Sequence, residues 1–182
     1  MPAKNAFRNA YPIILLTIVV AITVTLLTYA DRLTRGKIEA QEERKIQRML
    51  SEIFPDMSKY TFENDIYTVY SDEAKVGYAF LAVGKGYGGD INILVGLEDE
   101  KTIKDIIIVA QTETPGLGTR IVESSFTDRF IGLNIQDVAL KEEGGQIDAI
   151  TGSTISSKAV IDAVRETAME KVKLLTNSEE RG

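Results

Sequence analysis

The segment Asp148-Ala149-Ile150-Thr151-Gly152-Ser153-Thr154-Ile155-Ser156-Ser157 places five hydroxyl side chains and one glycine directly before a strongly helical C-terminal stretch. Thr154 lies just ahead of the first turn of the predicted helix. Unpaired backbone N–H groups and the positive end of the helix dipole favour an anion such as phosphate there. An ordinary N-cap is the alternative, because Ser and Thr are common at helix starts for purely structural reasons. The residues by themselves leave both interpretations open.

Two glycine-containing segments precede this one. The glycines of residues 84–91 (Gly-Lys-Gly-Tyr-Gly-Gly-Asp-Ile) permit positive φ and a close approach of the backbone to a ligand. The spacing is not a dinucleotide fingerprint, and an ordinary hairpin turn is the alternative. Residues 113–118 (Glu-Thr-Pro-Gly-Leu-Gly) predict a tight reversal that projects Leu117. Such a loop either covers a flat ring system or simply connects a strand to a helix.

The three segments, in this order, resemble the motifs of the FMN-binding domain family. In that family the last threonine of the hydroxyl-rich core carries FMN through a phosphodiester bond, and the resemblance assigns this role to Thr154. It also implies that a flavin transferase, using FAD, adds the group, with Asp148 recognised by the transferase or binding its metal. The further cofactor-binding residues that it implies are Tyr87, Gly88, Glu113, Thr114, Gly116, Leu117, Gly118, Thr151, Gly152 and Ser153.

One position departs from the family pattern. Many relatives have His two places before the Glu of the second segment, whereas this chain has Gln111. We therefore expect no essential proton transfer at this position.

Chain length and a single N-terminal apolar segment make the resemblance strongest to the G subunits of Rnf-type ion-translocating complexes. It implies a membrane-anchored electron carrier with covalent FMN that works with other subunits between ferredoxin and NAD. No complete active site of its own is expected. The C subunits of Na+-translocating NADH:quinone reductase, longer as a family, are the nearest alternative. A tethered module that binds FMN or another anion noncovalently, and a purely structural subunit with a capped helix, are the other hypotheses.

The chain of 182 residues contains no Cys and no His. This excludes, within the chain, Cys/His zinc sites, iron–sulfur ligation, haem held by His or Cys, thiolate nucleophiles and imidazole bases. We expect no metal site and no catalytic side chain, so redox chemistry requires an organic cofactor. The formal net charge of -6, without a basic patch, makes nucleic acid an unexpected partner.

Residues 9–30 contain no charged side chain. As a helix, 11–30 spans about 30 Å at roughly 1.5 Å per residue, which matches the hydrocarbon thickness of a bilayer. A single transmembrane helix is predicted; the rival is a cleavable signal peptide, for which the apolar run is long and Thr28-Tyr29-Ala30 is a poor cleavage site. Counting Lys and Arg slightly favours a cytoplasmic C-terminal part. The resemblance implies the opposite, a flavin domain on the extracytoplasmic face of the inner membrane, and we adopt that orientation.

The predicted fold class is α+β, an antiparallel sheet with packed helices preceded by the transmembrane helix. Alternating β-branched and aromatic residues predict four strands, at 66–70, 76–83, 91–97 and 103–110. A helix at 124–131, a short strand near Val138 and a long helix from Ser156 to about Leu175 complete the domain. The predicted organisation is an N-terminal tail (1–10), transmembrane helix (11–30), juxtamembrane helix or linker (31–57), FMN-binding domain (58–176) and C-terminal tail (177–182).

Residues 34–54 predict a charged helix with a partial apolar stripe, ended by Pro55. The helix either packs against its own domain or forms a stalk that touches a neighbouring protein of the complex. Neither the stripe nor the charges decide between these alternatives.

Overall fold

The computed structural model describes residues 3–179 and divides into two compact units, Met1–Gln47 and Arg48–Gly182. The outer ends of the two predicted tails, residues 1–2 and 180–182, lie outside the described residues. The elements in chain order are α1 (Ala3–Ile53), β1 (Lys59–Glu63), β2 (Ile66–Ser71), β3 (Ala74–Lys85), β4 (Asp90–Leu97), β5 (Ile103–Ala110), the 3₁₀ turn η1 (Gly118–Val122), α2 (Ser124–Thr127), η2 (Asp128–Phe130), η3 (Lys141–Glu143) and α3 (Thr154–Glu179).

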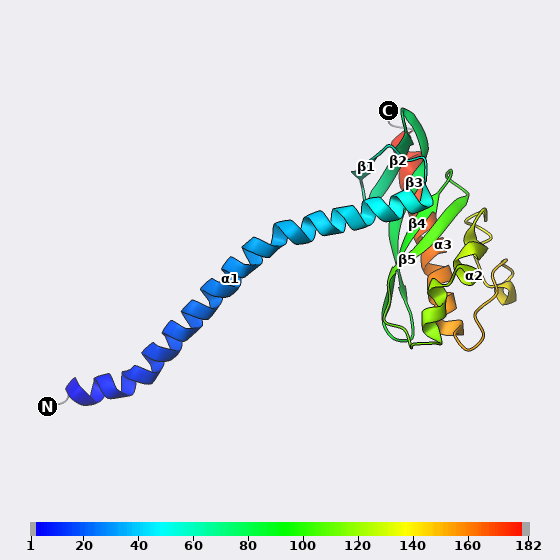
Figure 1. Cartoon of the computed structure of the whole chain (residues 1–182). Coiled ribbons are helices and arrows are strands. Elements are labelled where there is room, and N and C mark those ends of the chain that lie inside the picture. Colours follow the sequence, from blue (N-terminus) through cyan, green and yellow to red (C-terminus); the bar gives the residue numbers. More distant parts are fainter. Residues whose placement is uncertain (1–2, 180–182) are drawn as a thin grey trace. The chain divides into compact units, whose positions relative to one another are not determined.

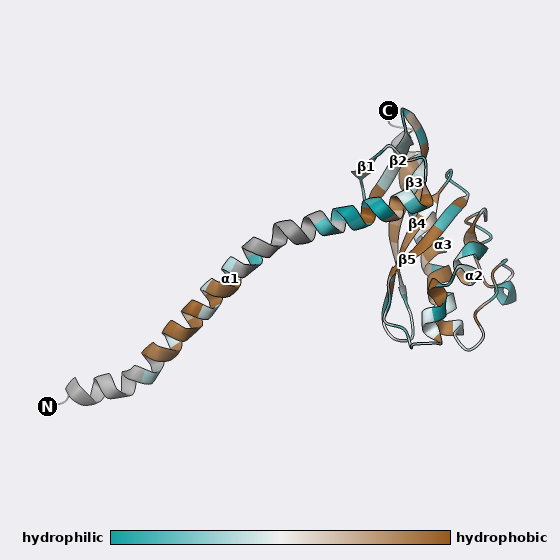
Figure 2. Ribbon diagram, in the orientation of Figure 1, coloured by the Kyte–Doolittle hydropathy of each residue, from teal (hydrophilic) through white to brown (hydrophobic). Residues whose placement is uncertain are grey.

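The first unit is the long helix α1 up to Gln47. The helix passes through Pro12 without a break, so the two helices predicted at 11–30 and 34–54 are one element, which ends at Ile53 just before Pro55. Along its length it changes from hydrophobic to hydrophilic residues (Figure 2). Over the described residues, no helix combines the length and the apolar character that crossing a membrane requires.

The second unit is built on a five-stranded antiparallel sheet whose strands lie in chain order, β1-β2-β3-β4-β5 (Figure 1). The α+β class and the four predicted strands are confirmed, and β5 has the predicted bounds, Ile103–Ala110. The edge strand β1 (Lys59–Glu63) was not predicted as a separate strand. Its side chains are mostly exposed, so it lacks the apolar alternation that identifies the other strands.

One face of the sheet packs against α3. Side chains at every second position of β3, such as Phe80 and Ala82, lie in one buried cluster with the cross-strand partners of β4 and with Val160 and Val164 of α3. Gly84 allows the closest approach, because a Cβ atom there would overlap the backbone carbonyl of Ala159. α3 begins two residues before the predicted start and extends into the predicted tail.

The end of α1 covers part of the opposite face, around Gly77 and Gly96. A Cβ on Gly77 would lie 2.6 Å from the Phe54 ring, and one on Gly96 would overlap Ile53, so both glycines make room for this helix end. Ile53 and Phe54 are buried. The last turn of α1 therefore packs against its own domain, one of the two alternatives considered above.

The connection between β5 and α3 is mostly irregular. The helix predicted at 124–131 is a short α2 followed by η2. The strand predicted near Val138 is wrong: the described residues have only an isolated bridge between Leu140 and Ile147 there. Val138 is buried in the main cluster as part of a loop, so its apolar character reflects packing rather than a strand.

Two adjacent residues of β3 test which side chains of this strand point toward α3 and which point to the other face of the sheet. Phe80→Ala should lower the free energy of unfolding by about 3–5 kcal/mol, because it leaves a cavity between the sheet and α3. Leu81 points to the other face and is 44% exposed, so Leu81→Ala should cost about 1 kcal/mol or less. Urea denaturation followed by circular dichroism measures both. Equal losses would contradict the assignment of faces.

Candidate functional site

Three segments distant in sequence meet around one cavity of about 490 Å³. They are the turn between β3 and β4, the loop after β5, and the start of α3. This volume is in the range of small-molecule sites, roughly 300–1,000 Å³. The residues that line it are Tyr87, Glu113, Thr114, Leu117, Gly118, Gly152, Ser153, Thr154, Ile155 and Ser156.

The carboxylate of Glu113 joins these segments. One oxygen, Oε1, accepts a hydrogen bond from the Gly88 N–H at 2.9 Å. The other, Oε2, accepts one from the Ser156 hydroxyl at 2.5 Å. The residue is only 4% exposed. Glu113 therefore holds the β3–β4 turn and the first turn of α3 at a fixed separation.

Glycines surround this carboxylate for steric reasons. A Cβ atom on Gly86 would overlap Glu113 Oε1, and one on Gly118 would lie 2.7 Å from Oε2. A Cβ on Gly88 would overlap the carbonyl oxygen of Thr112. Gly86, Gly88 and Gly118 are thus explained by the close packing around Glu113 and the preceding Thr112, which leaves no room for a side chain.

Gln111 and Thr112 complete the join between the loop and the turn. The side-chain oxygen of Gln111 accepts the backbone N–H of Glu113 at 2.6 Å, and the Thr112 hydroxyl donates to the Gly88 carbonyl at 3.2 Å. Gln111 therefore fixes the backbone of the neighbouring Glu113.

The hydroxyl-rich segment forms a turn that opens α3 at Thr154. Gly152 has a φ of +81°, which an L side chain rarely adopts. The buried Ser157 closes the turn: its hydroxyl accepts the Ile150 N–H at 3.0 Å and donates to the Ser153 carbonyl at 2.9 Å. Thr154 is exposed at this helix start. The turn therefore presents the threonine to solvent on a constrained backbone.

Neither Ser153 nor Ser156 acts as a cap of this helix. The Ser156 hydroxyl donates to Glu113. The Ser153 hydroxyl is buried and has no hydrogen-bond partner among the described residues. An orphaned hydroxyl in a cavity wall is costly unless a ligand pairs with it.

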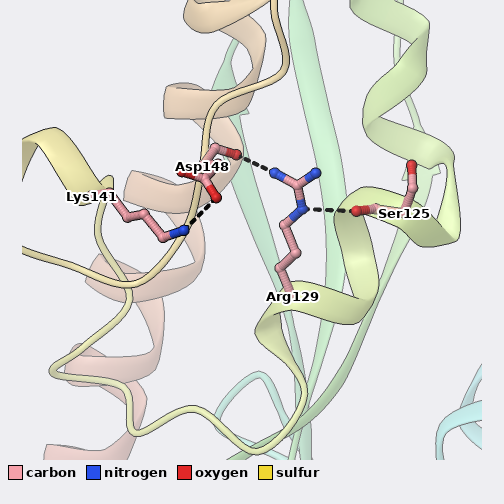
Figure 3. Close-up of polar contacts among 4 residues, drawn as sticks. All are labelled: Ser125, Arg129, Lys141 and Asp148. Carbon is pink, nitrogen blue, oxygen red and sulfur yellow. Dashed lines mark hydrogen bonds and ion pairs between the residues drawn. The ribbon is translucent and has the colours of Figure 1, made fainter.

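Asp148 is held at the surface by two cations from other segments (Figure 3). Its carboxylate pairs with Lys141 Nζ at 2.5 Å, and its backbone carbonyl accepts from Arg129 at 2.7 Å. Arg129 also donates to the Ser125 carbonyl at 2.8 Å, which links α2 to the turn. More than half of the Lys141 and Asp148 side chains is exposed, so the ion pair stabilises the turn only weakly.

A further cation follows on α3. Lys158 pairs with Glu143 at 2.7 Å and with Asp162 at 3.3 Å. The hydrogen bond to Glu143, followed by that to Asp162, raises the pKa of Lys158 above its usual value. Its charge is thus already matched by two carboxylates.

Apolar side chains form the open walls of the cavity. Tyr87 is 73% exposed, Leu117 51% and Ile155 58%. Large exposed apolar side chains gathered at a cavity are typical of a site for a ligand or a partner. One wall comes from each of the three segments, which suits a flat ring placed between them.

The structure brings most of the predicted site residues to this cavity. Gly88, Gly116 and Thr151 do not line it. Gly88 contributes its N–H to Glu113, and the Gly116 N–H donates to Thr119 Oγ1 at 2.9 Å. Ile155 and Ser156 line the cavity but were not predicted to do so. The only signal for them in the sequence is their place immediately after Thr154 on the helix.

A family model and several known proteins are similar to this chain, and their descriptions agree with one another. A family model described as FMN-binding domain matches residues 86–169. The G subunit of the ion-translocating oxidoreductase complex of Pasteurella multocida is 30% identical over 91% of this chain and 95% of its own length. The G subunit of the proton-translocating ferredoxin:NAD(+) oxidoreductase complex of Clostridium ljungdahlii is 33% identical over 76% of this chain and 78% of its own.

Solved structures offer a more distant likeness. The crystal structure of Shewanella oneidensis NqrC covers 66% of this chain and 73% of its own, with 18% identity and a TM-score of 0.49. The C subunit of the Na(+)-translocating NADH-quinone reductase from Parabacteroides distasonis covers 59% and 61%, with 25% identity and a TM-score of 0.48.

The closed turn before α3 can be tested through Ser157. Ser157→Ala leaves the buried Ile150 N–H without its acceptor and should cost about 1–3 kcal/mol of unfolding free energy. Ser125→Ala, at an exposed serine, is the control and should change stability by less than about 0.5 kcal/mol. Chemical denaturation measures both. A Ser157→Ala variant as stable as the control would show that the two hydrogen bonds of the Ser157 hydroxyl, here called the Ser157 clip, are dispensable.

Proposed function

Because the chain belongs to the family of G subunits of ion-translocating oxidoreductase complexes, we propose that it is an electron-carrying subunit whose FMN occupies the cavity beside Thr154. The observation that carries the proposal is the meeting, around one cavity, of an exposed threonine at a helix start and the two glycine segments. The match of residues 86–169 to the FMN-binding domain spans nearly all of the three segments and supports it.

The residues present fit FMN. The start of α3 offers unpaired N–H groups and a positive dipole end to a phosphate. The buried Ser153 hydroxyl, unpartnered among the described residues, supplies a donor in the cavity wall. Tyr87, Leu117 and Ile155 supply apolar surfaces for the ring. When bound, FMN supplies reversible electron acceptance. The chain itself has no Cys or His that could hold another redox centre.

Covalent attachment at Thr154 is consistent with the same geometry. The threonine hydroxyl would attack the FMN phosphate of FAD within the active site of a flavin transferase. A phosphoester bond to Thr154 forms as the pyrophosphate bond breaks, the hydroxyl proton leaves to a base of the transferase, and AMP departs. Gly152 leaves space beside the acceptor, and the Asp148 carboxylate, exposed and weakly paired with Lys141, is accessible to the transferase. The remaining negative charge lies at the helix start, where it is stabilised.

The electron path requires partners. Among the described residues, the titratable side chains that line the cavity are Glu113 and Tyr87. The name of the Clostridium ljungdahlii relative includes ferredoxin and NAD(+). We infer that other subunits of such a complex deliver and remove the electrons, and that this chain relays them between those partners.

Membrane attachment is part of the proposal. The uncharged residues 9–30 belong to α1, and the large apolar side chains described between Ile14 and Tyr29 are exposed. An exposed apolar run of this length is stabilised by transfer into lipid. Residues 11–30 would then form a single-pass anchor. A lone uncharged helix offers no ion path, so translocation belongs to other subunits.

The attachment residue is tested by Thr154→Val. After coexpression with a flavin transferase, the native chain should give a band that fluoresces under ultraviolet light in denaturing electrophoresis. Thr154→Val should abolish the band, because it removes the acceptor oxygen and keeps the side-chain shape. Thr176→Val, at an exposed threonine of α3 that does not line the cavity, is the matched control and should keep it. Retained fluorescence in Thr154→Val would move the attachment site, and a native chain without fluorescence in its own membrane would overturn the covalent proposal.

The orientation is tested by reporter fusions. Alkaline phosphatase fused after Gly182 should be active, since it folds only outside the cytoplasm, and the same reporter fused to the N-terminal tail should be inactive. The reverse result would place the flavin domain in the cytoplasm.

A further inference from the structure

We propose that Glu113 is the positioning residue of the flavin site and that its buried negative charge lowers the midpoint potential of the flavin. The inference rests on the function proposed above and assigns to Glu113 two effects that experiment can separate. One is mechanical and acts through its two hydrogen bonds. The other is electrostatic and acts through its charge.

The mechanical effect follows from what the carboxylate connects. Gly88 lies 25 residues before Glu113, and Ser156 lies 43 residues after it. Gly88 follows Tyr87, and Ser156 follows Ile155, two of the apolar walls of the cavity. The single carboxylate therefore sets the distance between walls from separate segments, and Gln111 in turn fixes its backbone.

Both oxygens of the Glu113 side chain are hydrogen-bonded, which suits a carboxylate, whose two oxygens are acceptors. The donors are a backbone N–H and a hydroxyl, neither of which carries a net charge. Within the part of the chain that the structure describes, no Lys or Arg forms an ion pair with Glu113. Among the residues that the structure describes, no cation is therefore paired with its charge.

The electrostatic effect follows from where this charge lies. Glu113 is 4% exposed and lines the cavity. A buried charge acts on its neighbours more strongly than one in water, because the surrounding dielectric is low. An added electron is repelled by the carboxylate, so the reduced form is disfavoured and the midpoint potential falls.

Glu113→Gln removes the charge and keeps the contacts. The amide oxygen accepts from the Gly88 N–H, and the amide NH₂ donates to the Ser156 hydroxyl oxygen, which is also an acceptor. Glu142→Gln is the matched control, since it removes one charge from an exposed position that does not line the cavity. The full-length, flavinylated proteins are compared by redox titration monitored by absorbance. Glu113→Gln should have a more positive midpoint potential than the native chain, and Glu142→Gln should not.

Two further variants separate the mechanical effect of the Glu113 hydrogen bonds from the effect of its charge. Glu113→Ala removes both hydrogen bonds, and Ser156→Ala removes one while the charge stays. Both should weaken the visible circular dichroism of the flavin and speed protease cleavage of the turn at 86–89. Glu113→Gln should restore the native dichroism. Ser156→Ala should keep a midpoint potential no more positive than that of the native chain.

The outcomes separate this inference from the proposed function. A fluorescent covalent band in native protein and in Glu113→Gln, with equal midpoint potentials, overturns the electrostatic effect and leaves the proposed function intact. Native dichroism in Glu113→Ala overturns the mechanical effect. A Glu113→Gln chain that is folded but not flavinylated also contradicts the inference, because the amide preserves both contacts. No flavin in the native chain overturns the proposed function and this inference with it.

Discussion

The two hydrogen bonds of Glu113 constrain the part of the molecule where the cavity lies. They join a turn of the sheet to the first turn of a helix, across separations of 25 and 43 residues in sequence. A buried carboxylate is unfavourable unless its oxygens are satisfied, so the backbone must bring Gly88 and Ser156 to it. Glycines at 86, 88 and 118 are the steric consequence.

The sheet provides the frame for this constraint. β3 and β4 pair from Tyr78 with Leu97 to Lys85 with Asp90, so the turn at their end has a fixed position. α3 lies close against β3, where Gly84 admits the Ala159 backbone. The start of α3 and the turn are thus held from both sides, by apolar packing and by the Glu113 carboxylate.

Local patterns in the sequence predicted the regular parts of the fold. The alternation around Phe80 and Ala82 located β3 and its buried face, and the hydroxyl-rich segment located the start of α3 to within two residues. β1 was missed because its exposed residues carry no alternation. The strand near Val138 was predicted wrongly for the opposite reason, since an irregular loop can bury an apolar residue as fully as a strand does.

The candidate site was predictable only in part. The resemblance of three segments to a family identified most of the residues that line the cavity, but not the bridge from Glu113 to Ser156. That bridge joins residues 43 positions apart, and neither periodicity nor spacing carries information about such a contact.

The clip formed by Ser157 has a consequence for the rate of electron transfer to and from the flavin proposed beside Thr154. It fixes the backbone on which Thr154 sits, just as Glu113 fixes the opposite wall. A redox centre held in this way has a nearly constant tunnelling distance to its neighbours and requires little nuclear reorganisation when its charge changes. A stiff turn at Thr154, the proposed attachment point, would thus favour fast electron transfer in both directions without any moving part in this domain.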